Sequence, residues 1–249
     1  MKAPLLSVHI SVDYPGKPSV IDGIAIRVQE GEVVGLAGES GSGKSTIALA
    51  ILRLLEWRGG RVRGEIWFDG RDLMRLKESQ LRRLRGREMS LVMQSPASAL
   101  NPALRLETQL RESWRVHSQT PWREARPQVH ALLERMGLPV DGDFLSHYPS
   151  QVSVGQAQRV VIAMAVLHQP KLIVADEPTS ALDPGSRLEI LNLFRSLVAE
   201  NRAALIYISH DVPSMQALCD RIHILHAGKL APCMPVDEHR GAPQPLSLS

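Results

Sequence analysis

The sequence predicts an α/β fold with a mainly parallel core sheet, and three observations support this. Strand-like and helix-like segments alternate along most of the chain, as expected when helices join parallel strands. A glycine-rich loop at 38–46 follows an apolar strand-like stretch and leads into an apolar helix-like stretch. The continuous apolar run at 172–175 is typical of a strand buried on both faces.

The first third of the chain is expected to place short strands around the glycine loop. Apolar residues that alternate or partly alternate predict strands at 6–12 and 24–28, and the residues after the loop predict a helix to about Leu55. A turn region rich in Gly and Arg is expected over 57–64, followed by a strand and turn at 65–70.

The remaining elements are predicted from leucine spacing, apolar runs and proline or glycine breaks. They are a helix over 73–85, a strand at 90–94, a helical stretch over 102–145 broken at Pro121 and at 137–139, a helix over 156–167, strands at 172–175, 204–209 and 222–225, and a helix over 187–200. We therefore expect one domain over 1–230 with a helical insert at about 95–165. The proline-rich residues 231–249 are expected to form a disordered tail.

Composition and charge exclude several classes of protein. A chain of 249 residues, 44% of them hydrophobic, can bury the core of one large domain with a subdomain. The net charge is only +3, and no aromatic residues are interleaved with Arg82, Arg83, Arg85 and Arg87, so we interpret these as a solvated helix face and expect no nucleic-acid partner. No apolar run is long enough to span a bilayer.

The N-terminus and the two cysteines also carry expectations. Met1–Pro4 lacks the apolar core of a signal peptide. Cys219 and Cys233 have no metal-ligand spacing and are expected to be reduced thiols of a cytosolic protein.

The glycine loop has the spacing G-x-x-x-x-G-K-S between a strand and a helix, which predicts a nucleoside triphosphate site. Glycines let backbone N–H groups turn toward phosphate, and the helix N-terminus favours an anion. Lys44 is expected to reach the β- and γ-phosphates, and Ser45 to offer its hydroxyl to Mg²⁺. The candidate ligand residues are Gly38, Glu39, Ser40, Gly41, Ser42, Gly43, Lys44, Ser45 and Thr46.

Polar residues follow three of the predicted buried strands. Asp176 and Glu177 end the strand at 172–175, where ligands sit in open α/β sheets. Asp176 is expected to hold Mg²⁺ and Glu177 to polarise the attacking water. His210 follows the strand at 204–209 as a candidate γ-phosphate sensor, and Gln94 is either a ligand of Mg²⁺ and water or a bland turn residue.

These motifs, in this order, resemble the ATP-binding subunit of ABC transporters. Besides the two phosphate motifs, Gln94 corresponds to the Q-loop, 151–159 to the signature, 180–183 to the D-loop and His210 to the switch histidine. The resemblance implies a P-loop NTPase fold with an N-terminal antiparallel β-subdomain and an inserted α-helical subdomain. It also implies ATP hydrolysis with ATP and Mg²⁺ as ligands, and catalytic roles for Glu177, His210 and Gln94.

The stretches at 92–96 and 98–102 resemble the oligopeptide, dipeptide and nickel importer branch. The resemblance implies that Tyr14 stacks on adenine. It also implies a head-to-tail homo- or heterodimer, in which Ser153, Gly155, Gln156 and Asp183 complete the partner's ATP site. Two membrane permease subunits would place the chain peripherally on the cytoplasmic face of the inner membrane, with an extracytoplasmic binding protein acting indirectly.

The chain departs from the family pattern at two places. Val154 replaces the first glycine of the Leu-Ser-Gly-Gly-Gln signature, where a β-branched residue restricts the backbone and adds bulk. We therefore hypothesise that the composite ATP site using this signature is slow or degenerate. The segment 231–249 lacks the C-terminal segments of the long oligopeptide type, which favours a nickel or metal-chelate subunit.

Two functions from different classes remain open. The first is an ATPase subunit that energises an ABC importer for peptides, nickel or a metal chelate. The second is a soluble ABC-type ATPase in a cytoplasmic enzyme complex, because carbon–phosphorus lyase has a subunit that resembles this branch. Co-purification with permease subunits or with soluble lyase subunits discriminates between them.

Overall fold

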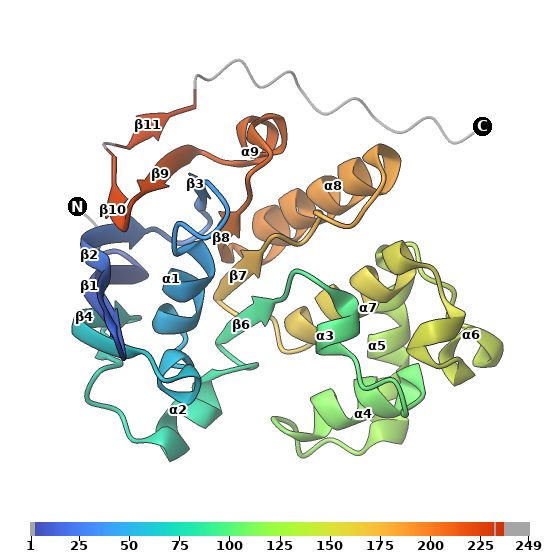
Figure 1. The fold of residues 1–249 in the computed structure, drawn as a ribbon. Coiled ribbons are helices and arrows are strands. Elements are labelled where there is room, and N and C mark those ends of the chain that lie inside the picture. The colour runs from blue at the N-terminus through green and yellow to red at the C-terminus, as the bar shows by residue number, and fades with distance from the viewer. Residues whose placement is uncertain (1–2, 232, 237–249) are drawn as a thin grey trace.

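The computed structural model describes residues 3–231 and 233–236 as two β-sheets and a set of helices (Figure 1). The smaller sheet is antiparallel, in the order β2-β1-β4-β5, and the larger sheet has the order β10-β9-β3-β8-β7-β6, with β11 also paired to β9. Strands β9, β3, β8, β7 and β6 of the larger sheet pair with one another in parallel, whereas β10 and β11 pair antiparallel with β9. The predicted fold class, an α/β cassette with an antiparallel β-subdomain, is confirmed.

The elements have the following bounds. The strands are β1 (Leu6–Tyr14), β2 (Lys17–Val28), β3 (Val33–Gly38), β4 (Arg61–Phe68), β5 (Arg71–Asp72), β6 (Met89–Val92), β7 (Leu172–Asp176), β8 (Ala204–Ile208), β9 (Arg221–His226), β10 (Lys229–Leu230) and β11 (Met234–Pro235). The α-helices are α1 (Lys44–Ile51), α2 (Glu78–Leu84), α3 (Pro96–Ala99), α4 (Leu106–Arg115), α5 (Trp122–Arg135), α6 (Gly142–Ser146), α7 (Val154–Val166), α8 (Pro184–Asn201) and α9 (Val212–Leu218), with 3₁₀ turns η1 (Leu55–Arg58) and η2 (Pro149–Gln151).

The central strands are apolar without a break because the parallel sheet is buried on both faces. Along β8, Ala204, Ile206 and Ile208 face one hydrophobic core together with α1 and the antiparallel sheet. Leu205 and Tyr207 face the other core, which α7, α8 and α9 complete. Alternate side chains of β8 therefore pack into two different cores, and neither face of the strand is exposed to water.

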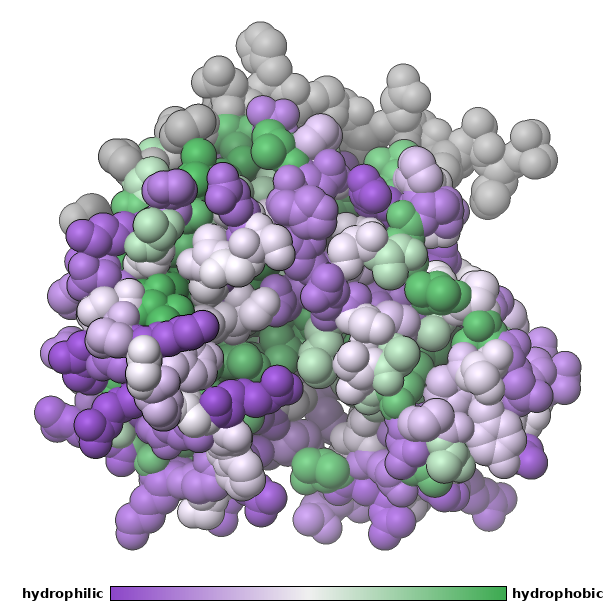
Figure 2. Space-filling model, viewed as in Figure 1, coloured by the Kyte–Doolittle hydropathy of each residue, from purple (hydrophilic) through white to green (hydrophobic). Residues whose placement is uncertain are grey.

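Between β6 and β7 the described chain is helical, from α3 to α7. The helix α7 packs on both β6 and α3, and this joins the helical region to the parallel sheet. In the space-filling view, a hollow separates the region of α2 from the region of α4 (Figure 2). The helical region thus forms a lobe beside the sheet (Figure 1).

Parallel pairing brings the functional ends of four strands to one edge of the sheet. Strands β3, β8, β7 and β6 run in the same direction and in this order, so their carboxyl ends lie side by side. The glycine loop, Gln94, Glu177 and His210 all follow these strand ends directly. The order of the strands therefore gathers residues that are far apart in the sequence.

Several local expectations are corrected. The helix after the glycine loop ends at Ile51 instead of near Leu55, because Leu55–Arg58 tightens into a 3₁₀ turn. The turn expected over 57–64 is shorter, since β4 already pairs with β1 from Arg61. The helix expected from residue 73 begins only at Glu78, because 71–72 pairs with β4.

The arginine cluster at 82–87 predicts that Arg85 lies on a solvated helix face, and this prediction is wrong. It follows the end of α2, and its guanidinium donates to the carbonyl oxygens of Leu52 and Arg53, both at 2.7 Å. These bonds satisfy carbonyls just beyond α1, and the side chain is only 17% exposed.

The predicted tail over 231–249 also begins with paired backbone. Met234 and Pro235 pair antiparallel with Ile222 and Arg221 of β9. Residue 232 and residues 237–249 lie outside the described part of the chain. No helix within the described residues has the length and apolar character needed to cross a bilayer.

Candidate functional site

The glycine loop joins β3 to α1 and depends on glycine at two positions. Gly38 has a φ of +156°, and a Cβ there would lie 2.4 Å from the carbonyl oxygen of Leu225. Gly43 caps α1 with a φ of +107°, and its Cβ would lie 2.6 Å from Ile21 Cδ1. A side chain at Gly38 would collide with backbone, and one at Gly43 would be strained by the positive φ, so both positions suit the glycine of a loop that wraps closely around an anion.

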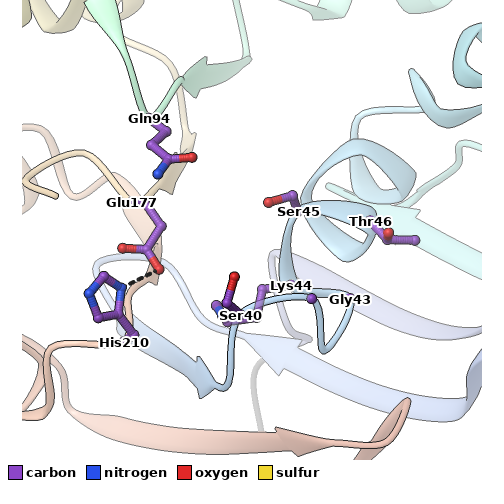
Figure 3. Close-up of a pocket in the computed structure, with 9 residues that line it drawn as sticks. Ser40, Gly43, Lys44, Ser45, Thr46, Gln94, Glu177 and His210 are labelled. Carbon is purple, nitrogen blue, oxygen red and sulfur yellow. Dashed lines mark hydrogen bonds and ion pairs between the residues drawn. The ribbon is translucent and has the colours of Figure 1, made fainter. Parts of the chain in front are cut away.

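A cavity of about 420 Å³ opens in front of this loop. Figure 3 shows Gln94, Glu177 and His210 on one side of it and the loop and the start of α1 on the other. Its lining consists of Ser40, Gly41, Gly43, Lys44, Ser45, Thr46, Gln94, Glu177 and His210, all of which are candidate residues predicted from the sequence. Gly38, Glu39, Ser42 and Asp176 belong to the same loop and strand end but do not line the cavity.

Lys44 is the first residue of α1 and is only 7% exposed. Its Nζ donates to the carbonyl oxygens of Gly38 at 2.8 Å and Glu39 at 2.9 Å. The loop thus holds the ammonium group at the cavity. When a phosphate binds, its charged oxygens would replace these carbonyl oxygens as the acceptors for Lys44 Nζ.

Asp176 offers oxygen atoms that suit a divalent cation. Its Oδ1 is buried and accepts no hydrogen bond, and the Ser45 hydroxyl interacts with the same carboxyl group. Burial raises the pKa of Asp176, and the negative charge of Glu177 adds to this, while the Ser45 hydrogen bond and Lys44 oppose it. A cation at this carboxylate would relieve both unfavourable contributions.

The donor set fits Mg²⁺ better than a metal held by protein alone. Within the described residues, no three or more His, Cys, Asp and Glu side chains gather into a metal site. Asp176, Ser45 and Gln94 supply only hard oxygen ligands, and Mg²⁺ characteristically takes one or two such groups and completes its shell with phosphate and water. These three residues would therefore hold a Mg²⁺ bound together with the nucleotide.

Glu177 is both buried and conformationally strained. The residue is 9% exposed, and its φ of +50° lies in the left-handed region, which costs a non-glycine residue about 1–3 kcal/mol. Its backbone N–H donates to the carbonyl of Ile208 at 3.0 Å, and its Oε1 lies 2.9 Å from His210 Nδ1. The dashed line in Figure 3 marks this pair, whose carboxylate is turned to the cavity.

The signature residues lie away from this cavity. Ser153 caps α7, accepting from the Gln156 backbone N–H at 3.1 Å, while Gln156 accepts from the Ser153 N–H at 3.0 Å. A Cβ at Gly155 would lie 3.5 Å from Ser186 Oγ, an ordinary contact. The fold itself does not require glycine at 155, so the open backbone is available to another molecule.

Asp183 and Tyr14 also lie outside the cavity. Asp183 caps α8 by accepting from the Ser186 N–H at 3.0 Å. The hydrogen bond from the Ser186 side chain, followed by that from its backbone N–H, lowers the pKa of the Asp183 carboxyl. Tyr14 ends β1, is half-buried, and packs so closely over Gly60 that a Cβ there would lie 3.2 Å from its ring. Neither residue is among those that line the cavity.

The structure changes the physical reading of Val154. This residue is the first of α7 and does not have a positive φ, so the backbone is one that valine adopts without strain. Its side chain is 52% exposed. Of the two effects expected from the sequence, the backbone restriction does not hold, and only the bulk at the surface remains.

Tyr207 and Thr179 lie beside the site but are not predicted from the sequence. Their hydroxyl groups lie 3.0 Å apart, and the two residues are 0% and 2% exposed. The Tyr207 hydroxyl oxygen is the single polar side-chain atom in the apolar run of β8. Because a buried hydroxyl needs a hydrogen-bond partner, this residue type was the signal from which a contact could have been predicted.

The fold and the edge site together define a P-loop ATPase. A sequence profile of the family described as ABC transporter matches residues 21–180, more than half of the chain. The chain therefore belongs to the ABC transporter family and is an ATP-binding, ATP-hydrolysing subunit.

Relatives and solved structures agree with this assignment. A protein of Brucella abortus named for ATP binding in peptide import is 40% identical over 240 residues, covering 95% of this chain and 72% of the relative. The dipeptide transport ATP-binding protein DppD of Bacillus subtilis is 37% identical, over 90% of this chain and 68% of its own length. The dimeric, post-hydrolysis structure of the ATP-binding cassette MJ0796 superposes with a TM-score of 0.81 at 26% identity, covering 93% of this chain and 98% of that one.

Proposed function

We propose that this chain energises an ABC importer for peptides by binding and hydrolysing ATP on the cytoplasmic face of the membrane. The names of the two relatives favour peptides over nickel or a metal chelate as the transported substrate. Both relatives are transport proteins, which also favours an importer over a soluble complex such as carbon–phosphorus lyase. Membrane permease subunits are then its partners, as the transport role in the names of both relatives implies.

One observation carries the hydrolytic role: the buried Glu177 carboxylate faces the glycine loop across the cavity (Figure 3). A carboxylate there can orient water toward a phosphate held by the loop and accept its proton. His210 Nδ1 lies 2.9 Å from Glu177 Oε1, fixes the direction of the carboxylate and remains largely exposed to the cavity mouth. When Mg²⁺ is bound, it supplies positive charge that stabilises the phosphate oxygens.

The position of the signature supports a two-chain site. Ser153 and Gly155 do not line the cavity of their own chain, yet Gly155 leaves backbone open where the fold has no need of glycine. Val154 and Leu188, near this open backbone, are large apolar residues that are 52% and 58% exposed. A second ATPase subunit packed on this face would cover them and bring its own glycine loop to the signature.

Glu177→Gln tests the hydrolytic role. The amide keeps the shape of the side chain but cannot accept the proton from water, so we expect turnover to fall at least about 100-fold while ATP affinity changes less than about 3-fold. Glu124→Gln, at an exposed position of α5, is the matched control and should hydrolyse ATP normally. Near-normal hydrolysis by Glu177→Gln would remove Glu177 from this role.

Co-purification tests the importer. The chain should be recovered from detergent-solubilised membranes together with permease subunits and should leave the membrane fraction when these are absent. Recovery in a soluble assembly with lyase subunits would instead support the cytoplasmic enzyme complex.

A further inference from the structure

The strained backbone at Glu177 needs support from its surroundings. The loop after it is a tight turn, in which the Ser180 N–H and hydroxyl both reach the Glu177 carbonyl oxygen, at 3.2 and 3.1 Å. These contacts lie within the loop and do not fix it to the sheet. A residue with a φ of +50° relaxes unless other parts of the fold hold it.

The loop is tied to the neighbouring strand β8 by a buried hydrogen bond. Thr179 Oγ1 lies 3.0 Å from the hydroxyl oxygen of Tyr207, and both side chains are shielded from water. The Tyr207 ring packs edge-on against Phe194 of α8, with centroids 6.2 Å apart. Because the ring is fixed by packing, its hydroxyl is a rigid anchor for the loop.

The Tyr207 hydroxyl stays protonated over the physiological range. Burial raises the pKa of Tyr207 to about 12, against the opposing hydrogen bonds of Thr179 and Ser209. The hydroxyl therefore always has a proton to donate, and the anchor does not switch with pH.

We propose that Tyr207 is a positioning residue for hydrolysis, whose hydroxyl holds Glu177 in its left-handed backbone through Thr179. Strand β8 then fixes Glu177 by three bonds: the Ile208 carbonyl holds its N–H, Tyr207 holds its loop, and His210, just beyond the strand, holds its carboxylate. This inference rests on the proposed role of Glu177 as the group that orients water.

Tyr207→Phe removes only the anchoring hydroxyl and tests the proposal in the full chain assembled with its partner subunits. We expect kcat for ATP hydrolysis to fall about 10-fold, the equivalent of one lost hydrogen bond, while the KM for ATP changes less than about 2-fold. In a Glu177→Gln background the same substitution should reduce the residual rate by less than about 2-fold, because the hydroxyl acts through Glu177.

Two further variants separate positioning from stability. Thr179→Val combined with Tyr207→Phe leaves no buried hydroxyl of the pair unpaired, so thermal stability should recover toward that of the unsubstituted chain while kcat stays low. Val8→Ala removes buried methyl groups from the other core, away from the Tyr207 ring, and should lower the melting temperature but leave kcat unchanged.

Three results would overturn the role of Tyr207: an unchanged kcat in Tyr207→Phe, a kcat that recovers together with stability in the double variant, or a full 10-fold loss that persists on top of Glu177→Gln. Near-normal hydrolysis by Glu177→Gln alone would instead contradict the proposed function. The failure of the inference and the failure of the proposed function are thus distinguishable.

Discussion

The buried carboxyl group of Asp176 lowers the stability of the nucleotide-free protein. Its buried Oδ1 has no hydrogen-bond partner, and its pKa is raised mainly by burial. A raised folded-state pKa means that the ionised carboxylate weakens the fold above that pKa, whereas below the unfolded-state pKa both states are protonated and the effect vanishes. The nucleotide-free protein therefore carries a destabilising charge that a bound cation would neutralise.

We predict that Asp176→Asn stabilises the nucleotide-free protein by about 1 kcal/mol at pH 7, since it removes the buried charge. The gain should disappear near pH 3, where Asp176 is protonated in both states. Urea unfolding without nucleotide or divalent cation measures both values, and ATP hydrolysis by the variant should be lost. If the variant were less stable at pH 7, the Asp176 carboxylate would have to make a favourable hydrogen bond or ion pair in the nucleotide-free protein.

Val154 gives a second prediction at a single residue. Since its backbone is already helical, only its exposed bulk can hinder a partner's phosphate. We expect ATP hydrolysis in the assembled transporter to rise several-fold in Val154→Ala and at least as much in Val154→Gly. Alanine is the sharper test because glycine at a helix terminus also weakens α7. Equal rates in all three proteins would show that the valine does not slow the composite site.

At the scale of elements, the sequence predicts best where one physical cause dominates. Unbroken apolar runs identify β7 and β8 because both faces of a parallel strand are buried. The G-x-x-x-x-G-K-S spacing identifies β3, the loop and α1 because phosphate binding constrains the two glycines, the lysine and the serine. The predictions fail where a distant segment decides the outcome: β1 pairs with β4 from Arg61, and β11 pairs with β9.

The residues of the site show the same contrast between features that local sequence determines and features that distant segments determine. The cavity lining follows from motifs, because each lining residue lies directly after a strand or within the loop. The partner of Tyr207 and the burial of Arg85 depend on which elements meet in space, and local spacing carries no signal for that.

An ion pair between elements gives a prediction with a defined pH dependence. Lys171, just before β7, lies 2.7 Å from Asp69 in the turn after β4. The hydrogen bond from Lys171 is the largest cause lowering the pKa of Asp69, and its bond to Asp69 likewise raises the pKa of Lys171. A lowered carboxyl pKa adds stability above its unfolded value, and this stability is lost as the pH falls through the folded value. A raised lysine pKa adds stability that is lost at alkaline pH.

We therefore expect Lys171→Met to reduce the free energy of unfolding by about 0.5 kcal/mol between pH 5 and pH 9, since both side chains are partly exposed. The difference from the unsubstituted chain should shrink below about pH 4, as Asp69 is protonated. Urea titrations across this range check the profile, with the exposed Lys17→Met as control. A difference that does not change with pH would indicate lost packing instead of lost charge.

At the scale of the whole molecule, the functional residues form two separate groups. The cavity gathers the glycine loop with Gln94, Glu177 and His210, and the N-terminal ends of α7 and α8 gather the signature with Asp183. Gly155 lies against Ser186, so the second group forms one surface of its own. If the signature contributes to an ATP site, as we propose, a chain that keeps the two groups apart can complete that site only with a second chain.

The last prediction follows from this division. ATP favours the closed dimer only if each nucleotide contacts the glycine loop of one chain and the signature of the other. In the Glu177→Gln chain, ATP persists, so sedimentation velocity with ATP and Mg²⁺ should show a dimer, whereas ADP should leave a monomer. Lys44→Ala, which removes the phosphate-binding ammonium, should stay monomeric with either nucleotide. If Val154 hinders pairing of two identical chains, adding Val154→Gly to Glu177→Gln should raise the dimer fraction. A monomer in every variant at saturating ATP would contradict pairing of two copies and direct the search to a different ATPase partner.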